Sequence, residues 1–370
     1  MNPQKRRAEK GGSSNGKLAL LDLTYPEIQQ LLLALGEPGY RADQIYEWIY
    51  SSLVSDFAGM RNLPQHLRDH LEETAALCRL IPLQETRSPR GLTRKVLFAL
   101  SDAETIESVL MLYDKRNTVC LSTQVGCPLG CPFCATGQSG FTRNLTAGEI
   151  IEQVLYFARE LRQEGGRVTN VVFMGMGEPL LNYDATWQAI ETLTDPRGYN
   201  MGARRITIST VGIVPGIQRL SHENLQVGLA VSLHAPDDNL RRTLGPTARR
   251  SPLKELLAVC RSYVRRTGRR VTFEYALIQG INDSPPHAVQ LARLLEGLLC
   301  HVNLIPLNPT PESPWQASSK ERVSRFHGEL GRLGVNSTVR LGRGMEIEAG
   351  CGQLRSRWHS AEEAKDCILA

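Results

Sequence analysis

From Thr118 onward, short runs of β-branched and apolar residues alternate with longer stretches of helical periodicity. This alternation limits the fold more than any other feature, because strands that alternate with helices form right-handed βα units around a parallel sheet. Six strands are too few for an eight-unit barrel, so we expect the α/β class and a partial (βα)6 barrel, with an open sheet as the alternative. The expected strands are Val119–Ser122, Val171–Met174, Ile206–Ser209, Val227–Leu233, Val271–Leu277 and Val302–Leu307.

Capping signals mark the starts of the intervening helices. Thr146 with Glu149, and Ser318 with Glu321, have the spacing of capping boxes. Ser251-Pro252 fits the N-cap and first helical positions of another helix. In such folds ligands bind at the carboxyl ends of the strands, so loops that follow strands are the first place to look for a site.

The first part of the chain has a different pattern. Thr24 and Glu27 predict a capping box, Gly36 suits the end of that helix, and two further helices are expected around 45–53 and 64–77. Two alternating runs, Lys95–Leu100 and Ser108–Leu112, predict strands. The expected division is a disordered basic tail (1–17), a small helical domain (18–78), a β extension or linker (79–117), the partial barrel (118–355) and a C-terminal tail (356–370).

The composition indicates the compartment of the protein and argues against a membrane span. The 370 residues are 41% hydrophobic, which is enough for a packed core, and no run approaches 18 apolar residues. The nine cysteines are an odd number in a long chain without a visible export signal. We therefore expect a cytoplasmic protein without a membrane span, in which clustered cysteines bind metal or do redox chemistry.

Three cysteines lie within eight residues, Cys127, Cys131 and Cys134, in a Gly/Pro-rich loop after the first expected barrel strand. Three converging thiolates suit a metal or an iron–sulfur cluster, and a cluster with three protein ligands keeps one iron open to a small molecule. Structural zinc normally takes four ligands and no second cysteine pair follows, which makes zinc the weaker alternative. Three buried thiols without a ligand are weaker still, because a loop buries thiols poorly.

The Cys-x3-Cys-x2-Cys spacing, with Phe133 directly before the last cysteine, resembles the radical S-adenosylmethionine (SAM) superfamily. Gly175-Met176-Gly177-Glu178-Pro179, directly after the second expected strand, resembles the motif that holds the methionine end of that cofactor. From about Leu18 to Leu354 the chain is similar to the RlmN/Cfr family of RNA methyltransferases. The segments that carry this resemblance are Tyr40–Gln44, Val125–Cys134, Phe173–Leu180, Ser232–Pro236 and Ala349–Leu354.

The resemblance implies two cofactors, a [4Fe-4S] cluster on Cys127, Cys131 and Cys134, and SAM, two molecules of which are used per turnover. One SAM binds at the open iron and yields a 5′-deoxyadenosyl radical after one-electron reduction. The residues that the resemblance places around SAM are Gly177, Glu178, Ser209, Ser232, Leu233, His234 and Asn308. A histidine such as His234 would more often be structural, but its place after the fourth strand favours a site.

The resemblance also implies roles for three residues outside the cluster. Cys351 takes a methyl group from SAM, the radical removes hydrogen from that methyl, and the resulting carbon radical adds to adenine as a covalent enzyme–RNA adduct. Glu107 removes the adenine proton, and Cys120 attacks the sulfur of Cys351, which releases the methylated base and leaves a disulfide. From the residues alone, Cys120 is as readily a buried apolar filler and Glu107 a solvated strand glutamate. Glycines on both sides of Cys351 favour an accessible thiol.

A basic segment predicts where RNA binds. Between Arg241 and Arg270 there are ten basic residues and one acid, Glu255, a net charge of +9 that exceeds the +5 of the whole chain. Such a stripe fits phosphate contacts, although a solvated arginine-rich helix face is the simpler alternative. The RNA-binding candidates are Arg241, Arg242, Arg249, Arg250, Arg265, Arg266, Arg269 and Arg270.

The first hypothesis is therefore a radical SAM enzyme that methylates C2 of an adenosine in 23S rRNA and of the adenosine 3′ of the anticodon in some tRNAs. The alternative within the family is a Cfr-like enzyme that acts at C8. A different class is a metal-stabilised RNA-binding module without catalysis. The enzyme hypothesis implies a flavodoxin-like one-electron reductant and a monomer. Cys78, Cys260, Cys300 and Cys367 have no assigned role.

Overall fold

The structure of the protein is a computed structural model that describes residues 16–245, 251–309, 313–340, 353–355 and 358. The predicted tails at 1–17 and 356–370 fall almost wholly outside the described residues. Arg249, Arg250 and Cys351 also lie outside them.

One ten-stranded sheet forms the centre of the molecule, in the order β14-β13-β12-β11-β10-β9-β6-β5-β4-β3. From β6 to β14 every neighbouring pair is parallel, whereas β3, β4, β5 and β6 pair antiparallel. The parallel strands are β6 (Arg116–Cys120), β9 (Asn170–Phe173), β10 (Ile206–Thr210), β11 (Gly228–Ser232), β12 (Val271–Leu277), β13 (Cys300–Pro306) and β14 (Ser337–Val339). All six predicted strands are present, and β14 is a seventh that the sequence did not predict.

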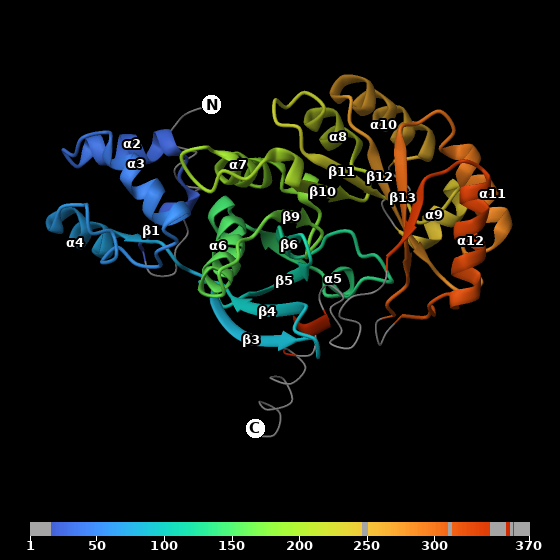
Figure 1. The fold of residues 1–370 in the computed structure, drawn as a ribbon, viewed down its shortest axis with the longest axis horizontal. Coiled ribbons are helices and arrows are strands. Elements are labelled where there is room, and N and C mark those ends of the chain that lie inside the picture. The colour runs from blue at the N-terminus through green and yellow to red at the C-terminus, as the bar shows by residue number, and fades with distance from the viewer. Residues whose placement is uncertain (1–15, 246–250, 310–312, 341–352, 356–357, 359–370) are drawn as a thin grey trace.

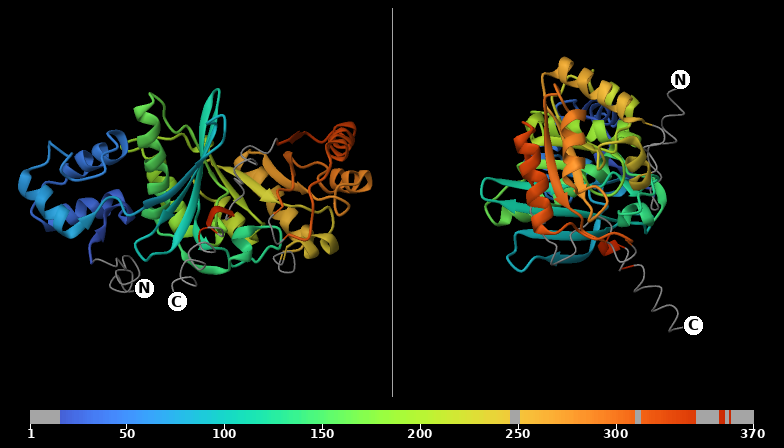
Figure 2. Two further views of the ribbon diagram at one scale, coloured as in Figure 1. Left: turned by 90° about the horizontal axis from the view of Figure 1, so that it is seen from below. Right: turned by 90° about the vertical axis from the view of Figure 1, so that its right-hand side faces the viewer.

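Helices cover the outer face of the parallel strands, as a partial barrel requires, and β14 and β3 form the two edges of the sheet without closing a ring. Figure 2 shows the helices packed around the curved strands. The helices are α6 (Ala147–Gln163), α7 (Tyr183–Thr194), α8 (Val214–Leu220), α9 (Asp238–Leu244), α10 (Leu253–Thr267), α11 (Pro285–Leu294) and α12 (Lys320–Arg332), with single turns η3 (Pro179–Leu181) and η4 (Ala203–Arg205). No described helix combines the length and apolarity needed to cross a bilayer.

The predicted β extension is part of the same sheet. Its strands are β3 (Ile81–Arg87), β4 (Thr93–Ala99) and β5 (Thr105–Tyr113), and β5 pairs with β6 from Val109↔Cys120 to Tyr113↔Arg116. This continuity brings β5 directly beside the first barrel strand. A side chain on β5 can therefore reach the barrel interior.

The N-terminal helical domain agrees with the prediction. Its elements are β1 (Leu18–Ala19), η1 (Leu20–Asp22), α2 (Tyr25–Ala34), α3 (Arg41–Tyr46), a π-helical turn η2 (Glu47–Ser51), α4 (Gln65–Thr74) and β2 (Ala75–Ala76). The Thr24/Glu27 capping box is confirmed, and Gly36 follows the helix with a left-handed φ of 77°. Figure 1 shows these helices at the opposite end of the molecule from α11 and α12.

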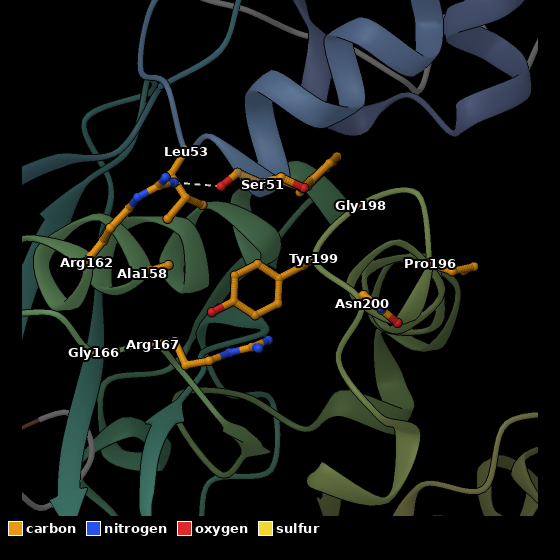
Figure 3. Close-up of a pocket in the computed structure, with 11 residues that line it drawn as sticks. Ser51, Leu53, Ala158, Arg162, Gly166, Arg167, Pro196, Gly198, Tyr199 and Asn200 are labelled. Atoms are coloured by element: carbon orange, nitrogen blue, oxygen red, sulfur yellow. Dashed lines mark hydrogen bonds between the residues drawn. The ribbon is translucent and has the colours of Figure 1, made fainter.

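Buried polar contacts join this domain to the barrel. The carboxylate of Asp22 accepts a hydrogen bond from the backbone N–H of Gly148 at 2.7 Å, at the start of α6. The buried carboxylate of Glu152 accepts from the N–H groups of Arg79 and Leu80 at 2.8–3.0 Å. A cavity of about 430 Å³ lies along the same seam, where Arg162 of α6 donates to the Ser51 carbonyl (Figure 3).

Two of the predicted helix starts are displaced by one residue. The capping box at Thr146 and Glu149 is confirmed, but α12 is capped by Ser319 and begins at Lys320. Ser318 instead donates to Asp283 at 2.7 Å, because its hydroxyl faces the buried carboxylate rather than the helix. Helix α10 begins at Leu253, with Pro252 in the cap position that was predicted for Ser251.

Candidate active site

The three clustered cysteines occupy the loop of a short hairpin formed by β7 (Gln124–Gly126) and β8 (Phe141–Asn144). Gly126 has a φ of 72°, and a Cβ there would lie 2.0 Å from the Gly140 carbonyl oxygen. Only glycine fits this close crossing of two backbones. The Cys127 N–H then donates to the same carbonyl at 2.7 Å, so the closed neck of the hairpin fixes the start of the cysteine loop. Helix α5 (Ala135–Gln138) follows the last cysteine.

Cys127, Cys131 and Cys134 line one cavity of about 170 Å³. Burial raises the pKa of the Cys127 thiol to about 11 and that of the Cys131 thiol to about 12. Further lining residues come from the barrel strands, the loops after them and α9: Gly177, Glu178, Val211, Ser232, Leu233, His234, Arg241 and Leu244. The structure thus brings the cysteines together with five of the seven residues predicted to bind SAM.

Glu178 is buried in the loop after β9 and is held in place on both sides. Its N–H donates to the Gln124 side chain at 2.8 Å, and its carboxylate accepts from the N–H groups of Leu180 and Val211 at 3.1 and 2.8 Å. Burial raises the pKa of Glu178 to about 7, although these donors favour the ionised form. The predicted Gly175–Pro179 motif therefore places a carboxylate, that of Glu178, in a fixed position at the wall of the cavity.

Gly177 has a φ of 99°, and a Cβ at this position would lie 2.6 Å from the Cβ of Gln124. The chain can therefore pass close to the β7–β8 hairpin only because residue 177 has no side chain. This close approach holds the Gly177-Glu178 turn directly beside the hairpin that carries the cysteines.

His234 also has a left-handed backbone, with a φ of 59°, which is uncommon for a residue with a side chain. Its Nδ1 accepts from the Ala276 N–H at 3.0 Å, and its ring meets that of Phe133 edge-to-face at 5.3 Å. Burial lowers the pKa of His234 to about 4, so the imidazole is neutral at pH 7. A strained backbone held by neighbours is typical of functional sites.

The other two predicted SAM residues, Ser209 and Asn308, do not line this cavity. Ser209 lies on β10, with Ala230 opposite it on β11. Asn308 follows β13, and its amide donates to Gln353 at 3.4 Å. Gln353 is two residues after Cys351, so Asn308 contacts the segment that follows the predicted methyl-accepting cysteine.

Cys120 lies on the first barrel strand, as expected; it is the last residue of β6, which ends two residues earlier than predicted, and it is partly buried. Burial raises the pKa of its thiol to about 11, opposed by a hydrogen bond from the Met174 backbone and by the charge of Arg340. The alternation along β6 places Val119 in the core, so Cys120 faces the barrel interior.

Glu107 on β5 is not a solvated residue, because it is 2% exposed. Its Oε2 pairs with the Nζ of Lys95 at 2.8 Å, and its Oε1 accepts from the Arg355 N–H at 2.6 Å. The Arg355 guanidinium in turn donates to Thr105 at 3.1 Å and Glu104 at 3.0 Å. Glu107 therefore holds the segment that follows Cys351 against β5, a contact that the sequence did not predict.

The basic stripe is only partly on the surface. Arg242, Arg265, Arg266 and Arg270 are exposed and Arg269 is partly exposed. Arg241 is not on that surface: it is 4% exposed and donates to the carbonyls of Ser251 and Val211, because α9 turns it into the cavity. The prediction that Arg241 contacts RNA is at odds with this position.

Among the described residues, no three His, Cys, Asp or Glu side chains are arranged to hold a single metal ion. The three thiols instead surround part of a larger cavity. A cation there would favour the thiolate forms, which burial otherwise disfavours. The donor set, the cavity that the thiols share with Glu178 and the absence of a Gly177 side chain all fit a cysteine-bound cluster with an organic cofactor beside it.

Comparison with known families agrees with these features. Residues 121–292 match the radical SAM superfamily, whose members use a [4Fe-4S] cluster and SAM. Residues 18–77 match the "Ribosomal RNA large subunit methyltransferase N-terminal domain". The second match covers almost the whole predicted helical domain.

Individual relatives are similar along most of the chain. A protein of Symbiobacterium thermophilum named "Probable dual-specificity RNA methyltransferase RlmN" is 51% identical over 92% of each chain. "Ribosomal RNA large subunit methyltransferase N" of Nitrosopumilus maritimus is 47% identical over 89% of this chain and 96% of its own. The crystal structure of a radical SAM methyltransferase from Sphaerobacter thermophilus superposes with a TM-score of 0.89 at 54% identity, covering 90% of this chain and 98% of its own. The chain therefore belongs to the RlmN family and is a radical SAM RNA methyltransferase.

Proposed function

We propose that the protein methylates C2 of a specific adenosine in 23S rRNA and of the adenosine 3′ of the anticodon in some tRNAs. The observation that carries this proposal is the identity of about one half, over nine-tenths of the chain, to relatives named as dual-specificity RNA methyltransferases. The burial of Glu107 beside the segment that follows Cys351 supports it, because a base and a methyl carrier must act at one place.

In this proposal Cys127, Cys131 and Cys134 hold the cluster, and the Gly177–Glu178 turn with Ser232, Leu233 and His234 surrounds SAM. When bound, these cofactors supply an organic radical by one-electron reduction of SAM. Ser209 and Asn308 lie outside the lining of the cysteine cavity, and in this proposal they contact the part of SAM that extends beyond it. In α/β barrels the groups that bind ligands lie at the ends of the strands and in the loops that follow them, as these residues do.

Three residues of the chain then carry the methyl group to RNA. Cys351 accepts it from a first SAM as S-methylcysteine, gives up one hydrogen atom of that methyl to the radical, and becomes joined to the adenine through the same carbon. Glu107 takes the proton from the adenine ring. Cys120 attacks the sulfur of Cys351, which frees the methylated base and leaves a disulfide that must be reduced before the next turnover. Two SAM molecules are used each time.

RNA reaches the site with one base turned out of its stack. Arg242, Arg265, Arg266, Arg269 and Arg270, together with Arg249 and Arg250, contact its phosphates. We propose that the enzyme is a cytoplasmic monomer, supplied with single electrons by a flavodoxin-like protein.

Mass spectrometry of nucleosides tests the proposal. Cells that lack the gene should lose 2-methyladenosine from 23S rRNA and tRNA, and the wild-type gene, but not Cys351→Ala, should restore it. Appearance of 8-methyladenosine instead would identify the Cfr-like alternative. Unchanged 2-methyladenosine in the deletion strain would refute C2 methylation by this enzyme.

A further inference from the structure

Glu274 on β12 is a buried acidic side chain to which none of the preceding roles is assigned. On β12, Phe273 and Tyr275 belong to the core, and the Tyr275 ring lies 5.3 Å from that of Phe326 on α12. Because side chains alternate along a strand, Glu274 faces the opposite way, into the barrel. It is 4% exposed.

Among the described residues, one of the two carboxylate oxygens of Glu274 has a hydrogen-bond donor and the other has none. Oε1 accepts a hydrogen bond from the Asn303 amide at 2.8 Å, which fixes the orientation of the group. Oε2 is buried and has no hydrogen-bond partner within the described part of the chain. A buried carboxylate oxygen without a donor is costly, so this position calls for a donor from outside these residues.

Glu274 lies next to the cavity that holds the clustered cysteines. Its register partner on β11 is Ser232, and the Leu233 N–H donates to the Glu274 carbonyl at 3.0 Å. Ser232 and Leu233 both line that cavity. On the other side Glu274 pairs in register with Asn303 of β13. The unpaired oxygen is thus one strand away from the wall of the cofactor cavity.

We propose that Glu274, oriented by Asn303, binds an adenosine inside the barrel by accepting a hydrogen bond from one of its hydroxyl or amino groups. The inference rests on the proposed function, in which both ligands, SAM and the target nucleotide of RNA, contain adenosine and carry such donors. Burial raises the pKa of Glu274, while Arg340 and Asn303 oppose that shift. A donor from the ligand favours the ionised form further.

The test uses the holoenzyme and two binding measurements. Glu274→Gln keeps the shape of the side chain but replaces one acceptor with a donor. We expect its dissociation constant for SAM, or for a target RNA hairpin, to rise at least tenfold, with cluster content and melting temperature unchanged. A rise for SAM alone identifies the cofactor as the ligand, and a rise for RNA alone identifies the target nucleotide. The matched control is Glu191→Gln, an exposed glutamate on α7 that lies outside the basic stripe.

A measurement on wild-type protein keeps the inference testable if the variant does not fold. SAM analogues that lack the 2′- or 3′-hydroxyl, and RNA hairpins with 2′-deoxyadenosine or purine riboside at the target position, each remove one donor. One of these should bind at least tenfold more weakly than its parent. If every analogue and the Glu274→Gln variant bind within twofold of their references, the oxygen is satisfied in another way and the inference is wrong.

These outcomes are separable from failure of the proposed function. Binding of SAM and RNA is measured without turnover, so it does not depend on which carbon receives the methyl group. Absence of 2-methyladenosine with wild-type protein refutes the proposed reaction. Unchanged affinities in an enzyme that does make 2-methyladenosine refute only the role of Glu274.

Discussion

Lys95 and Glu107 form an ion pair that is shut off from solvent, with 2.8 Å between Nζ and Oε2 and side chains that are 0% and 2% exposed. They lie on neighbouring strands, where Leu97 of β4 is the register partner of Glu107, so the pair is a diagonal one. Removing one member of such a pair leaves a buried charge without compensation. The ion pair therefore contributes to the stability of the β3–β5 extension, and it places a positive charge next to Glu107, the proposed base.

Replacing Lys95 with methionine should lower the free energy of unfolding by roughly 3–5 kcal/mol, since Glu107 would remain buried without its cation. Denaturant unfolding of wild-type and variant protein measures this loss. The double variant Lys95→Met/Glu107→Gln should recover much of it, because the charge is then gone. As a control, Arg332→Ala breaks an exposed pair with Glu329 and should leave the midpoint unchanged. A Lys95→Met protein as stable as wild type would contradict the pairing.

Arg355→Ala should slow methyl transfer to RNA at least tenfold, because Arg355 ties the segment after Cys351 to Glu104 and Thr105. Cluster content and SAM affinity should be unchanged. The measurement is product formation in a single turnover together with the fraction of S-methylcysteine at position 351. Arg355→Lys, which keeps a cation for Glu104, should recover part of the rate. Equal loss in the Arg332→Ala control would point to a general effect on folding instead.

Cys120→Ala should trap the covalent enzyme–RNA adduct, which denaturing electrophoresis of RNA-bound protein detects.

In the wild-type protein, the rate of adduct release should increase with pH. A thiol with a raised pKa of about 11 is ionised in roughly one molecule in ten thousand at pH 7. The thiolate fraction grows tenfold per pH unit below the pKa, so the logarithm of the release rate should rise with a slope near one from pH 7 to 9. Cys300→Ala serves as the control, because it removes a thiol to which no role is assigned. A release rate that does not change with pH, or normal product release by Cys120→Ala, would exclude the role assigned to Cys120.

Cys131→Ala should abolish cluster binding, since the two remaining thiolates, Cys127 and Cys134, cannot replace the third. Iron and acid-labile sulfide analysis of anaerobically purified protein checks this, and the wild-type protein should be brown. Cys78→Ala, at an exposed site at the end of the helical domain, should keep a full cluster. A colourless wild-type protein that contains zinc alone would speak against radical chemistry.

Neutralising Arg265, Arg266 and Arg270 should weaken RNA binding and lower its salt dependence, by about one unit of the log–log slope for each phosphate that the variant no longer binds. Titrations of labelled hairpin between 50 and 200 mM salt measure the slope. The same change at Arg332 should have no effect. If the triple variant keeps the wild-type slope, the exposed arginines form a solvated helix face and bind no phosphate.

The strands and the cysteine loop were predictable because their signals are local. The six parallel strands are short apolar runs bounded by turn residues, and the Thr24 and Thr146 capping boxes need only three residues of context. β3 was missed because most of its residues are exposed and it carries Pro82, which is tolerated at a sheet edge. β14 was missed because three residues give too little pattern.

Contacts between distant parts of the chain were not predictable. Arg355 meets Thr105 across 250 residues of sequence, and nothing local distinguishes it from the other arginines near the C-terminus. Arg241 looked like the first member of a basic stripe, whereas α9 turns it inward, where it donates to the carbonyls of Ser251 and Val211. Lys95 did leave a signal in the sequence, because it directly precedes the apolar run Val96–Ala99 of β4, and Glu107 is the single charge on the neighbouring strand β5.

The antiparallel extension also keeps the sheet from closing. Because β5 pairs with the edge of β6 that faces away from β9, β14 cannot pair with β6, and the described strands form an open sheet instead of a ring. On the proposed function, a folded RNA stays outside this open side of the sheet and inserts a single nucleotide. In that proposal selectivity depends on how an RNA presents the nucleotide, and a ribosomal hairpin and a tRNA arm use the same site.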